Sequence, residues 1–82
     1  MNILDEKLRS VLADVLDLPA AAITEDASPA TIERWDSLRH MSLIVAIEEA
    51  FGITLDDRAM DEVMSFAGAR DAVIRISGRR AA

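Results

Sequence analysis

The sequence predicts an all-α fold, a small antiparallel four-helix bundle with three longer helices, a short third helix and a long loop between the first two. Apolar residues recur every three or four positions in separate segments, which is the spacing of one helix face. Pro19 and Gly52 fall where two of these segments end, as expected of residues that stop a helix. No segment alternates in the manner of a strand. The chain suffices for one small domain over residues 1–82.

The first helix is expected from about Asn2 to Asp17, with acidic residues in its first turn, where they suit the helix dipole. Pro19 ends it, because a proline lacks the N–H that a further helical bond needs. The apolar stripe has four-three-four spacing and consists of Leu4, Leu8, Val11 and Val15, widened by Leu12 and Leu16.

A long connection from Pro19 to Trp35 follows, in which only the alanines at 20–22 favour a helical turn. Loops of this length in small domains are usually functional or disordered. A linker is the alternative, but no second domain follows that it would link. Ile23, Ile32 and Trp35 are expected to anchor the loop to the bundle.

The second helix is expected to begin at Asp36 or Ser37 and to end near Phe51, with Gly52 in the position that glycine favours after a helix. Two apolar stripes cover much of its circumference. One part faces the core, and the rest is expected to form a contact surface. The stripes are Leu38, Met41 and Val45, and Leu43, Ile47, Ala50 and Phe51.

Asp56 and Asp57 can cap a short third helix that ends at Val63 or Met64. The acidic residues of this helix lack the spacing of a Ca²⁺ loop. A partner-facing or merely solvated acidic surface is therefore expected rather than a metal site. These residues are Asp56, Asp57, Asp61 and Glu62.

A fourth helix is expected to begin after Ser65, which is suited to cap it. Gly78 is expected to end this helix, and residues 78–82 are expected to form a frayed tail. The apolar stripe has three-four-three spacing and consists of Phe66, Ala69, Val73 and Ile76.

The composition excludes several classes of function. The net charge is −6, from 15 acidic and 9 basic residues, which argues against nucleic-acid binding because that needs a basic face. Acidity suits partners with basic surfaces, or serves solubility alone. The chain has no cysteine and one histidine, so it offers no thiolate chemistry and no usual His/Cys metal site. No signal peptide or membrane span is visible, and a cytoplasmic location is expected.

The most informative stretch is Trp35-Asp36-Ser37-Leu38, which places a serine hydroxyl at the first turn of an apolar helix. A phosphate attached there would meet unpaired backbone N–H groups and the positive end of the helix dipole. Alone, a serine at this place is more often a simple N-cap. A helix and a long loop precede this stretch, and an apolar helix, a short acidic helix and a last helix follow it. In this order of elements the chain resembles acyl and peptidyl carrier proteins from about Ile3 to Ile76.

The resemblance implies that Ser37 carries a 4′-phosphopantetheine arm, transferred from coenzyme A by a separate phosphopantetheinyl transferase that supplies Mg²⁺. Asp36 would orient the serine, as a helix cap or as a metal-assisted docking contact, and Leu38 would contribute to an apolar patch beside the arm. The thiol of the arm would hold acyl or aminoacyl groups as thioesters for a loading enzyme, an acyltransferase or condensing enzymes. The protein itself would be a non-catalytic, monomeric carrier. The expected partner contacts are Arg39, His40, Met41, Val45, Asp56 and Asp57.

The chain departs from the carriers of fatty-acid synthesis just after the serine. Those carriers usually have acidic residues there and further along the helix, whereas this chain has Arg39, His40 and Ser42. Trp35 before the aspartate is also more typical of aminoacyl, peptidyl or specialised-metabolite carriers. We therefore expect a free-standing carrier of a dedicated pathway, of the polyketide, nonribosomal-peptide or fatty-acid-like kind, whose cargo the sequence leaves open.

Two alternatives stay open at this point. In one, the chain is an unmodified helical interaction module whose second helix docks into a groove, and Ser37 is only a cap. In the other, Ser37 and His40 share a helix face and form a nucleophile–base pair, but no orienting acid is evident, so an exposed polar histidine is expected. Glu48 and Glu49 diverge by about 100° on a helix and are expected to be solvated rather than a catalytic pair.

Overall fold

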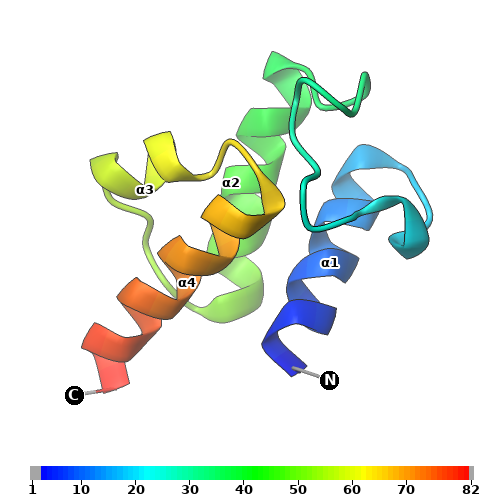
Figure 1. The fold of residues 1–82 in the computed structure, drawn as a ribbon. Coiled ribbons are helices and arrows are strands. Elements are labelled where there is room, and N and C mark those ends of the chain that lie inside the picture. Colours follow the sequence, from blue (N-terminus) through cyan, green and yellow to red (C-terminus); the bar gives the residue numbers. More distant parts are fainter. Residues whose placement is uncertain (1–2, 82) are drawn as a thin grey trace.

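The computed structural model describes residues 3–81, in which the predicted all-α fold with a short third helix is confirmed and no strand occurs. The three longer helices are α1 (Ile3–Leu16), α2 (Ser37–Phe51) and α4 (Phe66–Ala81), and α3 spans Asp57–Glu62. Figure 1 shows that α1 runs in the opposite direction to α2 and α4. The start of α2 therefore lies at the end of the bundle away from the first turn of α1 and the last turn of α4.

Helix α1 packs a row of leucines into the core. Leu8, Leu12 and Leu16 are fully buried, whereas Val11 and Val15 are only partly buried beside them. The centre of the stripe is thus the row at intervals of four, and the other members of the expected row, Leu4, Val11 and Val15, lie along its edge. Asn2, where the helix was expected to begin, lies outside the described residues.

The end of α1 is made by Asp17 rather than by a glycine. Asp17 has a left-handed backbone with φ 57°, a conformation that aspartate tolerates better than most residues. The Leu18 N–H then donates to the Ala13 carbonyl at 3.0 Å, which satisfies one of the last free carbonyls of the helix. The helix has therefore already ended before Pro19 is reached.

The long loop between α1 and α2 is a packed part of the domain. It contains a short 3-10 helix, η1 (Ala20–Ala22), and the expected anchors Ile23, Ile32 and Trp35 are all buried. Arg9 Nε donates to the Ile23 carbonyl at 2.8 Å, which ties the loop to α1. The Phe66 N–H donates to the Ala27 carbonyl at 2.9 Å, which ties it to α4.

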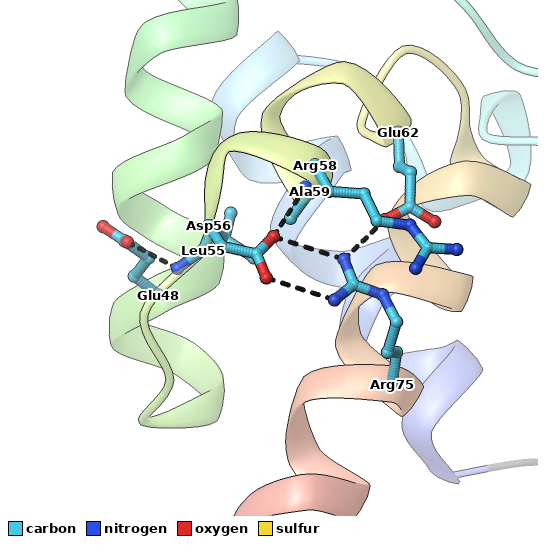
Figure 2. A network of polar contacts seen from close by, with 7 residues as sticks. All are labelled: Glu48, Leu55, Asp56, Arg58, Ala59, Glu62 and Arg75. Atoms are coloured by element: carbon cyan, nitrogen blue, oxygen red, sulfur yellow. Dashed lines mark hydrogen bonds and ion pairs between the residues drawn. The ribbon is translucent and has the colours of Figure 1, made fainter.

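Helix α3 is held at both ends by one arginine of α4. Asp56 caps α3, because its Oδ1 accepts from the Ala59 N–H at 2.8 Å, as expected. The Arg75 guanidinium reaches across from α4 and bonds to Asp56 at 3.1 Å and to Glu62 at 2.6 Å (Figure 2). Both carboxylates together raise the pKa of Arg75 above its ordinary value, the bond to Asp56 having the larger effect. These charged hydrogen bonds fix α3 to α4.

A second arginine of α4 fixes the loop. Arg70 makes a two-pronged contact with Glu25 at 2.7 and 2.9 Å and also reaches Asp5 of α1 at 3.3 Å. The hydrogen bond from Arg70 holds the pKa of the Glu25 carboxyl below its ordinary value. Loop, α1 and α4 are thus joined at one point by charge as well as by apolar packing.

Helix α4 confirms the predicted cap and stripe but not the predicted end. Ser65 Oγ accepts from the Gly68 N–H at 2.9 Å, and the four stripe residues are buried. The expectation that Gly78 ends the helix was wrong, because α4 continues through it to Ala81. The described part of the expected tail, residues 78–81, is thus helical, and Ala82 lies outside the described residues. Gly78 lacks the left-handed backbone that Gly52 has at the end of α2 (φ 63°).

The two glycines of α4 should respond oppositely to alanine. A Cβ at Gly68 would lie 1.9 Å from the Glu62 carbonyl oxygen, whereas a Cβ at Gly78 would meet nothing within 4 Å. We expect Gly68→Ala to lower the free energy of unfolding by about 1–3 kcal/mol through this clash. Gly78→Ala should raise it by about 0.5–1 kcal/mol through helix propensity. Urea denaturation of both variants is the measurement, and a destabilising Gly78→Ala would contradict a helix that continues past residue 78.

Candidate functional site

Asp36, and not Ser37, is the N-cap of α2. Its backbone is extended, and its Oδ1 accepts from the Arg39 N–H at 2.8 Å. Ser37 is consequently the first residue inside the helix. The sequence left open whether α2 begins at Asp36 or Ser37, since both residue types are good caps. The structure assigns the cap to Asp36.

The Ser37 side chain is exposed, and its hydroxyl bonds to no group among the residues that the structure describes. The expectation that Ser37 could serve as the cap is therefore wrong, because Asp36 already fills that role. A hydroxyl that is presented to solvent and not used by the fold is accessible to another molecule.

The first turn of α2 offers donors to an anion at Ser37. The N–H groups of Arg39 and His40 are used by Asp36, through its side chain and its carbonyl respectively. Those of Ser37 and Leu38 find no acceptor within residues 3–81, as is general for the first amides of a helix. Arg39 Nη1 also lies 2.9 Å from Asp36 Oδ2. This pairing offsets the negative charge that would otherwise repel a phosphate beside it.

His40 is held by the indole of Trp35. Trp35 Nε1 donates to His40 Nδ1 at 3.0 Å, and the two rings are stacked with 6.3 Å between their centres. Trp35 is buried and His40 is half-buried, so the expected exposed histidine was wrong. The sequence signal was a tryptophan five residues before a histidine, across the boundary between loop and helix.

The Trp35 contact also decides what His40 can do. Because Nδ1 accepts a hydrogen bond, the proton of the neutral imidazole is on Nε2. That nitrogen then donates and cannot take a proton from the serine hydroxyl, and no carboxylate in the described part of the chain orients the ring. The arrangement does not support the nucleophile–base pair that was the enzyme alternative.

A pocket of about 260 Å³ lies beside Ser37. Its walls are mostly apolar and come from the loop, the start of α2 and the connection between α3 and α4. Besides Ser37 and His40, the pocket is lined by Pro29, Trp35, Asp36, Met41 and Met64. The sequence placed Trp35 and Met41 near the serine but missed Pro29 and Met64, which are distant along the chain.

The exposed apolar stripe of α2 is present as predicted. Leu38, Met41 and Val45 are 78, 66 and 52% exposed, whereas Leu43 and Ile47 on the other side are fully buried. Met60 of α3 and Met64 beyond it add further exposed apolar surface. The bundle therefore fills its core and leaves an apolar face running from the serine along α2.

The acidic residues expected to face partners divide into two groups. The Asp56 carboxylate is engaged by the α3 cap and by Arg75, whereas Asp57 is exposed. Glu48 is not simply solvated, because its Oε2 accepts from the Leu55 N–H at 2.9 Å (Figure 2), while Glu49 is exposed.

No three His, Asp or Glu side chains within the described residues are grouped to hold a metal ion. No helix of that part of the chain is long and apolar enough to cross a membrane.

Comparison with known proteins agrees with this geometry. Residues 6–68 match the family model described as the phosphopantetheine attachment site. The chain is 35% identical to the polyketide-8 synthase acyl carrier protein 2 of Streptomyces avermitilis, over 77% of this chain and 72% of that protein. It is 33% identical to the acyl carrier protein of Guillardia theta, over 80% of this chain and 82% of that protein.

The chain belongs to the acyl carrier protein family. The solution structure of a holo acyl carrier protein from Geobacter metallireducens superimposes with a TM-score of 0.81 at 28% identity, covering 99% of this chain and 92% of that one. The present chain carries a covalently attached 4′-phosphopantetheine as its prosthetic group, and it functions as a carrier of acyl intermediates. The family is non-catalytic and works with biosynthetic enzymes.

The cap assignment gives a stability test. We expect Asp36→Ala to lower the free energy of unfolding by about 1 kcal/mol, because the Arg39 N–H loses its acceptor. Ser37→Ala should change it by less than about 0.5 kcal/mol, since its hydroxyl makes no bond within the fold. Chemical denaturation of the apo protein measures both, with Asp36→Asn as the control that keeps a capping side chain. A larger loss for Ser37→Ala than for Asp36→Ala would contradict the assignment.

Proposed function

We propose that Ser37 is the residue to which the 4′-phosphopantetheine arm is attached. The observation that carries the proposal is the exposed hydroxyl at the first residue of α2, which the fold does not use. Two free N–H groups, those of Ser37 and Leu38, support it, since they favour a phosphate at this position. Asp36 then acts by starting the helix so that the serine lies in its first turn.

The attachment is a phosphoryl transfer between the carrier and coenzyme A. The Ser37 oxygen attacks the phosphorus that bears pantetheine, a new oxygen–phosphorus bond forms, and the bond to adenosine 3′,5′-bisphosphate breaks. The hydroxyl proton passes to a base of the phosphopantetheinyl transferase, which also supplies Mg²⁺, because residues 3–81 contain no side-chain cluster for a metal. When bound, the arm supplies a thiol that holds the cargo as a thioester. The chain's own residues present the serine and support the arm.

The exposed face of α2 is proposed to dock the enzymes that modify and use this carrier. Leu38, Met41 and Val45 supply apolar contact beside the serine, and exposed apolar surface of this kind marks interaction sites. Asp57 supplies exposed negative charge at the start of α3, which favours partners with basic surfaces. Arg39 and His40 are also within this face, but the contacts with Asp36 and Trp35 restrict both side chains.

We propose that these partners are the phosphopantetheinyl transferase, an acyl- or aminoacyl-loading enzyme, and acyltransferases or condensing enzymes of a dedicated pathway. The support is the absence of acidic residues at positions 39, 40 and 42 of the sequence, together with the 35% identity to a carrier named for a polyketide synthase. A monomer fits this function, because the docking face must be free, and a cytoplasmic location is part of the proposal.

Loading of Ser37 is tested by intact-protein mass after incubation with coenzyme A, Mg²⁺ and a broad-specificity phosphopantetheinyl transferase. We expect the wild type to gain one phosphopantetheinyl group and Ser37→Ala to gain none. Ser42→Ala is the matched control, since Ser42 is an exposed serine on the same helix, and it should load like the wild type. Loading of Ser37→Ala would place the arm elsewhere, and failure of folded wild type to load would favour the unmodified interaction module.

The dedicated-pathway proposal is tested with condensing enzymes of fatty-acid synthesis. We expect the malonyl-loaded wild type to be elongated at least about tenfold more slowly than a fatty-acid carrier, because a basic enzyme surface meets no acidic residue after the serine. Ser42→Glu should partly restore the rate, whereas Ser10→Glu makes the same charge change on exposed α1 and should not. Efficient elongation of the wild type would count against a dedicated pathway.

A further inference from the structure

The pocket beside Ser37 has a size that matches one part of the arm. A pocket of about 260 Å³ has room for a short, branched segment such as pantoyl, with its two methyl groups, its hydroxyl and its carbonyl. It is too small for the whole arm with an acyl chain.

The covalent attachment selects the same segment. Ser37 itself lines the pocket, so a group bound to its oxygen starts at the pocket wall. The pantoyl segment follows the phosphate directly, whereas the distal amide, the thiol and the cargo come later along the arm. The segment nearest to the pocket is therefore also the one with a branched apolar carbon.

The walls are chemically suited to that segment. The side chains of Met41 and Met64, together with Pro29, supply apolar and adaptable surface for two methyl groups. His40 supplies a polar donor on the same wall, because the Trp35 contact leaves its Nε2–H without a partner among the described residues. Asp36 also lines the pocket, but Arg39 pairs with its carboxylate at 2.9 Å, which offsets the charge that would repel a phosphodiester.

Given Ser37 as the attachment residue, we propose that this pocket holds the pantoyl segment of the arm. The two pantoyl methyl groups lie against Met41 and Met64, and His40, fixed by Trp35, is a positioning residue that donates its Nε2–H to an oxygen of the phosphodiester. The base of the arm is thereby directed toward the connection between α3 and α4, and only the distal part with the thiol moves freely between enzymes.

Methionine methyl groups provide the test. The protein is labelled with ¹³C-methyl methionine and compared as apo and holo forms, with loading checked by intact mass, so that failure of attachment is detected separately. We expect the methyl resonances of Met41 and Met64 to shift on loading and to show nuclear Overhauser contacts to the pantoyl methyl groups. Met60 lies on α3 outside the pocket and should not change. A fully loaded protein with unshifted Met41 and Met64, or with contacts from acyl methylenes in place of the pantoyl methyls, overturns the proposal.

The role of His40 is tested by two substitutions with different hydrogen-bonding atoms. His40→Asn keeps an oxygen that can accept from Trp35 and removes the Nε2 donor, whereas His40→Gln keeps a donor at the reach of Nε2. In ³¹P spectra of the holo proteins, His40→Asn should move the phosphodiester resonance toward that of an unstructured phosphopantetheinylated peptide. His40→Gln should remain close to the wild type. A resonance that is the same in the wild type and His40→Asn overturns the positioning role.

Discussion

The hydrogen bond from the Arg39 N–H to the Asp36 carboxylate, at 2.8 Å, is the contact on which the functional site depends. It begins α2 at Ser37 and takes over the capping role that the serine would otherwise have. The serine hydroxyl is consequently free, and the amides of Ser37 and Leu38 are left for an anion. The same carboxylate receives the Arg39 guanidinium, so capping and charge compensation are achieved by one pair of residues.

This cap is effective only because the chain before it is fixed. Trp35 is buried one residue earlier, and Arg34 bonds to the carbonyl of Asp17 at 2.8 Å, at the end of α1. A cation is favourable at that place, since the carbonyl end of a helix carries partial negative charge. The end of the long loop is thus fixed before α2 begins, by the apolar contacts of Trp35 and by the hydrogen bond of Arg34. Such a loop orients the serine, in contrast to a flexible linker.

The sequence was sufficient to predict the helices and to select Ser37 as the candidate site, but not to predict the contacts around it. Helix spacing is a local property, so α1, α2 and the stripe of α4 could be predicted. Asp36 and Ser37 are both good caps, and only the three-dimensional structure separates them. Arg75 meets Asp56 across 19 positions, which no local pattern reveals. The prediction that α4 ends at Gly78 was wrong because a glycine destabilises a helix by only about 1 kcal/mol. That cost is too small to end α4 without a left-handed turn.

The exposed face of α2 follows from how the core is filled. Leu43 and Ile47 complete the core, so Leu38, Met41 and Val45, on the opposite side of the helix, have no partner inside the bundle. A carrier that visits several enzymes in turn must also leave each of them, and affinity differences between related complexes lie mostly in the dissociation rate. Three exposed apolar side chains form a small contact, far below the area of a permanent interface. A small apolar face beside a fixed serine therefore suits brief encounters in which the position of the arm, rather than tight binding, determines the outcome.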